Sequence, residues 1–136
     1  MKTTPYLTFP GTCAEAFAFY ATVLNGRIEA IFPHRGTPAA EHVPADWLDK
    51  IMHAHLVFGG NDLMGSDNSP AYYKPTQGLW VSLHVDSATE AERVFSALSD
   101  GGEVRMPLEK TFWAERFGMT VDRFGTPWMV NCAPAA

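Results

Sequence analysis

The sequence repeats one order of expected secondary structure, and this repeat constrains the fold more than any single motif. Apolar alternation, helical spacing and turn residues predict for the first half a strand at 5–9, a helix at 12–24, and strands at 27–33, 51–58 and 62–66. The same order returns in the second half, with a strand at 79–85, a helix at 87–100, and strands at 103–106, 117–121 and 126–132. Each half is therefore expected to be a βαβββ module. Such a module alone would leave one face of its small curved sheet exposed to solvent.

Matching residues at matching places support the repeat. Each helix is expected to open with a Ser/Thr-x-x-Glu capping box, Thr12 with Glu15 and Ser87 with Glu90. A glycine ahead of an apolar pair also recurs, as Gly60-x-x-Leu63-Met64 and as Gly125-x-x-Trp128-Met129. We expect a single α+β domain over residues 1–136, built from modules at about 1–67 and 79–136.

Charge and composition narrow the class of protein. Acidic residues outnumber basic ones by 15 to 10, and the basic residues are scattered singly, which argues against a nucleic-acid partner. No run of apolar residues reaches the roughly 18 that a membrane span needs, and no signal-peptide pattern opens the chain. Cys13 and Cys132 are expected to be free thiols, although the start of a helix at Cys13 could lower its thiol pKa. We expect a cytoplasmic protein without a membrane partner.

The segment 106–119 concentrates aromatic and charged side chains in a stretch too irregular for an amphipathic helix. Phe112 and Trp113 are expected to lie between two strands of the second module, as a wall or lid over a binding surface. Arg116 could anchor an anionic ligand, or it could pair with Asp67 or Glu109 and fix the loop. Glu109 and Glu115 are expected to form a solvated edge.

Several segments together carry a family resemblance: Pro5-Tyr6-Leu7-Thr8-Phe9, Ile51-Met52-His53-Ala54, Leu63-Met64-Gly65-Ser66-Asp67, Thr111-Phe112-Trp113, Arg116-Phe117-Gly118-Met119 and 124–132. With the duplicated βαβββ order, the chain resembles the vicinal oxygen chelate superfamily, in its PhnB-like branch, often labelled 3-demethylubiquinone-9 3-methyltransferase domain. The resemblance implies the glyoxalase/bleomycin resistance/dihydroxybiphenyl dioxygenase fold, in which tandem modules form a curved, cup-like mixed sheet.

Strand alternation then separates the side chains that face the cup from those that face the helices. His53 and His55 face the cup from one strand, Trp80, Ser82 and His84 from another, and Pro127, Met129 and Asn131 from the last. The predicted ligand-binding set is His53, His55, Met64, Trp80, His84, Phe112, Trp113, Arg116, Met129 and Asn131. Such a surface is mostly apolar with a few polar groups, which is typical of small-molecule pockets.

The resemblance also bears on metal binding. Metal-dependent members of the superfamily hold a divalent ion with His and Glu side chains from four strands, and those places fall here on Pro5, Met64 or Gly65, Trp80 and Met129. None of these is a ligand for zinc or Fe(II), so neither the usual metal nor another cofactor is expected. An alternative divalent site at His53, His55 and His84 stays open, because two imidazoles at i and i+2 can reach one ion.

The leading functional hypothesis is therefore a PhnB-like protein that binds a small aromatic or hydrophobic molecule in its cup. A metal-dependent enzyme that uses His53, His55 and His84 is the alternative. Methyl transfer is a weaker hypothesis, because no glycine-rich strand–turn–helix suits S-adenosylmethionine. A homodimer is expected, since a monomer would leave aromatic residues in the loops 34–49 and 67–78 exposed to water.

Overall fold

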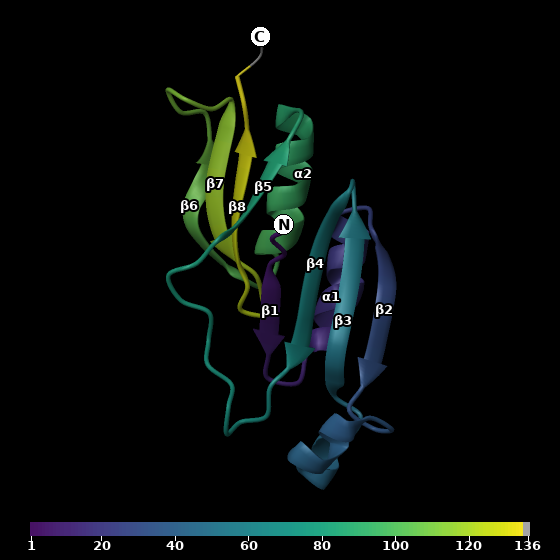
Figure 1. The fold of residues 1–136 in the computed structure, drawn as a ribbon. Helices are drawn as coiled ribbons and strands as arrows, with labels where there is room; N and C mark the ends of the chain where they lie inside the picture. Colours follow the sequence, from purple (N-terminus) through teal and green to yellow (C-terminus); the bar gives the residue numbers. More distant parts are fainter. Residues whose placement is uncertain (135–136) are drawn as a thin grey trace. The chain divides into compact units, whose positions relative to one another are not determined.

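A computed structural model describes residues 1–134, and its elements follow the predicted order (Figure 1). The first half contains β1 (Tyr6–Phe9), α1 (Cys13–Val23), β2 (Arg27–Pro33), β3 (Ile51–Phe58) and β4 (Asn61–Asp67). The second half contains β5 (Val81–Val85), α2 (Ala88–Ser99), β6 (Glu103–Glu109), β7 (Arg116–Val121) and β8 (Pro127–Cys132). The loop predicted at 34–49 holds two short 3₁₀ helices, η1 (Pro38–His42) and η2 (Ala45–Trp47).

The chain divides into two compact units, residues 1–75 and 76–136, each with one four-stranded mixed sheet. The strand order is β1-β4-β3-β2 in the first sheet and β5-β8-β7-β6 in the second. In both, the first strand of the module runs parallel to the fourth and the other pairs are antiparallel. The α+β class and the tandem βαβββ repeat are thus confirmed, whereas a single domain closed around one cup stays a prediction.

In the first unit, α1 packs on one face of the sheet (Figure 1). Phe9 of β1 meets Phe17 of α1 edge-to-face, with ring centroids 6.1 Å apart, and both rings are fully buried. Gly65 of β4 lets the helix come close, because a Cβ there would stand 2.8 Å from Phe17. No α-helix of residues 1–75 covers the other face, which we call the first open face: Tyr6, Phe32, His53, His55, Asp62 and Met64.

The second unit repeats this arrangement with α2 on its sheet. Buried Val94, Phe95 and Leu98 of the helix oppose buried Leu83, Trp128 and Val130 of the strands, as the alternation predicts. Gly118 again permits close approach, since a Cβ would lie 2.7 Å from Phe95. The face without an α-helix among residues 76–134, the second open face, consists of Ser82, His84, Phe117, Met119, Met129 and Asn131.

The two helices are capped differently, and one capping prediction was wrong. Ser87 accepts the backbone N–H of Glu90 at 3.1 Å, as predicted for α2. Thr12 caps nothing, and its buried hydroxyl has no hydrogen-bond partner within residues 1–134. Instead Asp67, at the end of β4, accepts the N–H groups of Gly11 at 3.0 Å and Cys13 at 2.9 Å. The carboxylate of a distant strand therefore supplies the cap of α1.

None of the helices in residues 1–134 is long and apolar enough to span a membrane.

Candidate functional site: two open sheet faces and a histidine–carboxylate pocket

The second open face consists of two cross-strand rows. Ser82, Met129 and Met119 lie side by side in one row. His84, Asn131 and Phe117 make the other. The two thioethers and the phenyl ring are partly exposed, so this face offers apolar surface with three polar side chains at the β5 and β8 side.

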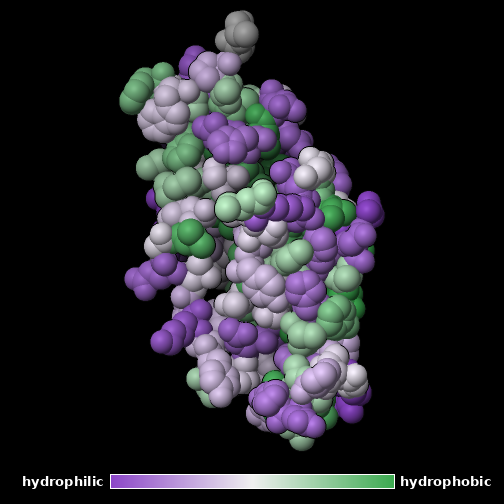
Figure 2. Space-filling model, viewed as in Figure 1, coloured by the Kyte–Doolittle hydropathy of each residue, from purple (hydrophilic) through white to green (hydrophobic). Residues whose placement is uncertain are grey.

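Aromatic side chains from the β6–β7 loop extend this surface. The Trp113 ring packs on Phe117 at 5.5 Å between centroids, and on Phe112 at 4.9 Å in an edge-on geometry. Trp113 is 49% exposed and Phe112 is 97% exposed. Figure 2 shows hydrophobic side chains on the surface over β6 and this loop, at its upper left. Phe112 and Trp113 thus lie between the second and third strands of the module, where the sequence placed them.

His84 gives the second open face its titratable group. Its Nε2 lies 3.3 Å from the Ser82 hydroxyl, and its Nδ1 lies 3.5 Å from the Asn131 side-chain amide. A neutral imidazole has one donor and one acceptor nitrogen, so the serine and the amide can fix its tautomer between them. The arrangement can orient a polar group of a ligand that rests on the apolar row.

Two predicted cup residues lie at the ends of strands, and a third lies on the other face of the second sheet. Trp80 precedes β5 and is half-buried, and Pro127 is buried at the start of β8. Arg116 lies opposite Cys132, on the helix-covered face of its sheet. Its guanidinium donates to Glu92 of α2 at 3.4 Å and to Glu115, so it pairs with carboxylates other than the suggested Asp67 and Glu109. The structure does not bring Arg116 to the second open face.

The first open face has an aromatic cluster around His53. The His53 ring stacks on Tyr6 with centroids 5.8 Å apart, and its Nδ1 is 3.1 Å from the tyrosine hydroxyl. Phe32, directly opposite on β2, also contacts His53 at 5.8 Å. Met64 lies between Tyr6 and His55 in the register of the sheet. Three of the predicted residues, His53, His55 and Met64, therefore share this face.

His55 has a carboxylate partner that sequence reasoning missed. Its Nε2 lies 2.6 Å from Oδ1 of Asp62, whose other oxygen forms an ion pair with Lys2. The hydrogen bond from Lys2, and then that from His55, holds the pKa of the Asp62 carboxyl below its usual value. The Gly59-Gly60 hairpin puts Asp62 opposite Val57 on the same face as His55, and this register was the signal that could have revealed the pair.

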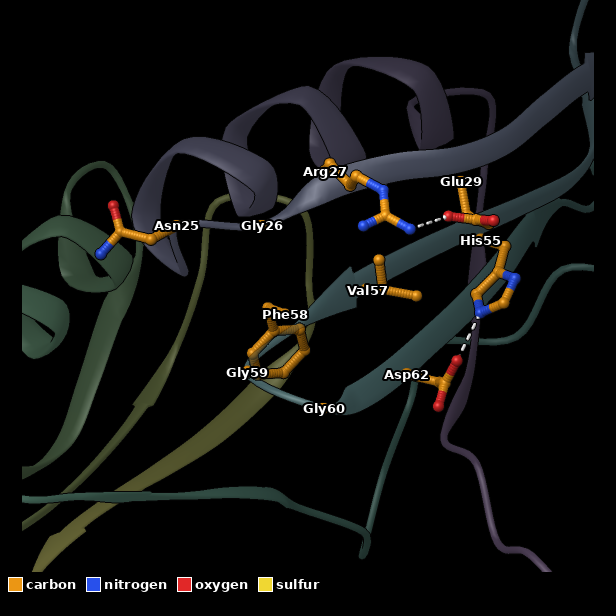
Figure 3. A pocket seen from close by; sticks show the side chains of 10 residues that line it. All are labelled: Asn25, Gly26, Arg27, Glu29, His55, Val57, Phe58, Gly59, Gly60 and Asp62. Atoms are coloured by element: carbon orange, nitrogen blue, oxygen red, sulfur yellow. Dashed lines mark hydrogen bonds and ion pairs between the residues drawn. The ribbon is translucent and has the colours of Figure 1, made fainter.

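An open pocket of about 600 Å³ borders this pair at one end of the first sheet. Figure 3 shows the His55–Asp62 pair below the Arg27–Glu29 ion pair, with Val57 beside both. The Arg27 and Glu29 atoms that form the ion pair are 2.7 Å apart. Asn25, Gly26, Phe58, Gly59 and Gly60 complete the lining. All ten lining residues come from the first unit.

The side chains at the superfamily's usual metal-binding positions are not suitable ligands for a divalent ion. Pro5 and Met64 are adjacent, joined by a 3.1 Å backbone hydrogen bond, but a proline ring and a thioether are not ligands for a hard or borderline ion. Trp80 and Met129 likewise offer no ligand for such an ion. Among residues 1–134, no three His, Cys, Asp or Glu side chains form a group that could hold a metal. The alternative site at His53, His55 and His84 stays a prediction.

Cys13 is not activated by the start of α1. It is fully buried, and this burial, followed by the nearby charge of Asp67, raises the pKa of its thiol far above the ordinary value. The expectation that the helix start could lower this pKa was therefore wrong, because loss of hydration outweighs the helix dipole.

These features define the class of protein: a glyoxalase-like α+β protein with two βαβββ units and partly apolar open sheet faces. Solved proteins described as members of the glyoxalase/bleomycin resistance/dioxygenase family share this fold at low sequence identity. The chain belongs to the family described as 3-demethylubiquinone-9 3-methyltransferase, whose sequence model matches residues 1–131.

Relatives cover nearly the whole chain. Protein PA1353 from Pseudomonas aeruginosa is 54% identical in sequence, with a TM-score of 0.89 and 98% of both chains covered. A PhnB protein from Bacillus cereus is 25% identical, with a TM-score of 0.76, covering 98% of this chain and 100% of its own. Protein YjdN of Escherichia coli K12 is 32% identical over 139 residues, covering 96% of this chain and 95% of its own. The PhnB-like resemblance is confirmed.

Proposed function

We propose that this protein binds a small aromatic or otherwise hydrophobic molecule on the open faces of its sheets, chiefly the second. The observation that carries the proposal is the row of Met119 and Met129 beside Phe117, extended by Trp113, with His84 at its edge. Covering partly exposed thioethers and rings with an apolar molecule is favourable, because apolar surface is removed from water. The flexible methionine side chains can also adapt to the shape of a planar ligand. The imidazole, hydroxyl and amide give that ligand an orientation.

Methyl transfer, which the family description names, has less support from these residues. Binding S-adenosylmethionine at a helix start needs free backbone N–H groups and a close, glycine-rich turn. At the start of α1, the N–H groups of Gly11 and Cys13 are already bonded to Asp67. At the start of α2, Ser87 takes the N–H of Glu90. The binding proposal does not require either helix start.

Replacing Met129 with glutamine is expected to weaken binding of a neutral apolar probe about tenfold, or roughly 1.4 kcal/mol. The side chain keeps its length but puts an amide where the probe needs apolar contact, and the amide loses water when the probe binds. N-phenyl-1-naphthylamine is a suitable probe, because its fluorescence rises in apolar surroundings and a titration of the full chain gives its affinity.

Tyr72→Gln is the matched control, since this exposed ring lies in the loop after β4, outside the second open face. Its affinity for the probe should equal that of the unmodified protein. Equal affinity in the Met129 variant would show that the probe binds elsewhere and would remove the main support for the proposal.

A further inference from the structure

The polar side chains of the second open face form a hydrogen-bonded chain that runs in one direction. The side-chain amide nitrogen of Asn131 lies 3.5 Å from Nδ1 of His84, and an amide nitrogen can only donate. Nδ1 is therefore the accepting nitrogen, and a neutral imidazole then carries its proton on Nε2. Nε2 lies 3.3 Å from the hydroxyl of Ser82, so this hydroxyl accepts a hydrogen bond from His84.

The direction of this chain leaves the hydroxyl proton of Ser82 available to a ligand. Because Nε2 already carries a proton, it cannot accept the serine proton as well. The Ser82 hydroxyl has no second hydrogen-bond partner within residues 1–134, and the residue is exposed. Ser82 therefore offers a hydrogen-bond donor at the β5 side of the second open face.

This donor lies at one end of the row of thioethers. Ser82 is directly opposite Met129 on the adjacent strand, and Met129 is directly opposite Met119 on the next. Neighbouring strands lie about 4.8 Å apart, so a row across three strands is about 10 Å long. A two-ring aromatic molecule that covers both thioethers can therefore reach Ser82 with a substituent on its ring.

The charge of this face favours a neutral acceptor as that substituent. None of its six residues is Lys, Arg, Asp or Glu, and His84 is neutral in the arrangement described above. Arg116 of β7 lies on the helix-covered face, where it donates to Glu92. A carboxylate would lose water here without gaining a cation. A carbonyl group costs less to dehydrate and still accepts a hydrogen bond from the hydroxyl.

We propose that the second open face binds an aromatic ketone or a related neutral aryl carbonyl compound. The aromatic rings cover Met129 and Met119, and the carbonyl oxygen accepts a hydrogen bond from Ser82. His84 and Asn131 are positioning residues, because they direct the serine proton toward the ligand. This inference rests on the proposed function, since it names the class of hydrophobic molecule that the same face takes.

The test compares 2-acetylnaphthalene with 2-isopropenylnaphthalene, which has a similar shape but a CH₂ group in place of the carbonyl oxygen. Displacement of N-phenyl-1-naphthylamine from the full chain gives the affinity of each. Ser82→Ala is expected to lower the ratio of ketone affinity to hydrocarbon affinity at least fivefold, because it removes the donor and keeps the thioethers. Ser66→Ala, which removes a partly exposed hydroxyl from β4 of the first unit, is the control and should leave the ratio unchanged.

A third ligand and a second method complete the test. 2-Naphthoate, a carboxylate on the same rings, is expected to bind at least fivefold more weakly than the ketone. Nitrogen-15 NMR of the unmodified protein covers the case in which the Ser82 variant does not fold. The neutral His84 ring should carry its proton on Nε2, and a proton on Nδ1 would contradict the direction of the hydrogen-bonded chain.

The outcomes separate this inference from the proposed function. An unchanged affinity ratio in the Ser82 variant, or tighter binding of 2-naphthoate than of the ketone, would overturn the inference alone, provided that the hydrocarbon still displaces the probe. If neither the hydrocarbon nor the ketone displaced the probe, both the inference and the proposed function would be overturned.

Discussion

Replacing Trp128 with alanine is expected to lower the free energy of unfolding by about 3–5 kcal/mol, the largest effect of any single change considered for this chain. The indole is fully buried under α2, and its N–H donates to Oδ2 of Asp122 at 2.8 Å. The other oxygen of Asp122 accepts the N–H groups of Phe124 and Thr126 in the β7–β8 turn. The change therefore leaves a cavity in the core and also removes a partner from the carboxylate that holds the turn.

Trp113→Ala is the matched control in the same unit, because it removes the same side chain from a half-exposed loop position. Its expected cost is below about 1 kcal/mol. Urea unfolding followed by far-ultraviolet circular dichroism compares the two variants without relying on tryptophan fluorescence. Equal losses in both variants would show that Trp128 is not the centre of the second core.

Replacing Asp67 with alanine is expected to cost about 3 kcal/mol, the second-largest effect. Besides capping α1 through Gly11 and Cys13, its second oxygen accepts the N–H of Ile51 at 2.8 Å, so one buried carboxylate ties α1 and β3 to the end of β4. Alanine would leave three backbone N–H groups without this acceptor in a place that water reaches poorly. The same urea experiment measures the loss.

Asp49→Ala provides the comparison, since this aspartate is exposed and bonds to the exposed Arg35 at 2.7 Å. An exposed ion pair of this kind contributes between zero and about 1 kcal/mol. If the Asp67 variant were no less stable than the Asp49 variant, the cap assigned to α1 would not be important for folding.

The sequence was sufficient to predict the repeat and most strand faces, because both depend on local patterns. Alternation placed Trp128 and Val130 in the core, as the structure confirms, and Ser82 and His84 on the opposite face of the sheet. The cap of α1 could not be predicted in this way. Thr12 is a residue of the right type at the start of the helix, but the actual acceptor is Asp67, more than 50 residues along the chain. Asp67 reaches the helix through the β1–β4 pairing.

The candidate site was predictable in part, for a similar reason. Periodicity placed His53 and His55 on one face, while the partner of His55 depended on the exact register of the β3–β4 hairpin. Arg116 stands between Glu115 and Phe117, and the sequence left open whether it anchors a ligand or pairs with a carboxylate. The alternation of β7 turns its side chain toward Glu92 on α2.

The central claim is that a small hydrophobic molecule binds on the second open face, and methyl NMR of labelled methionine tests it most directly. Met119 and Met129 lie on that face, whereas Met52 belongs to β3 of the first unit and serves as an internal reference. Adding N-phenyl-1-naphthylamine to the full chain is expected to shift the Met119 and Met129 methyl signals together and to leave Met52 in place. Shifts confined to other methionines, or no shift at a probe concentration that saturates the fluorescence, would contradict the account.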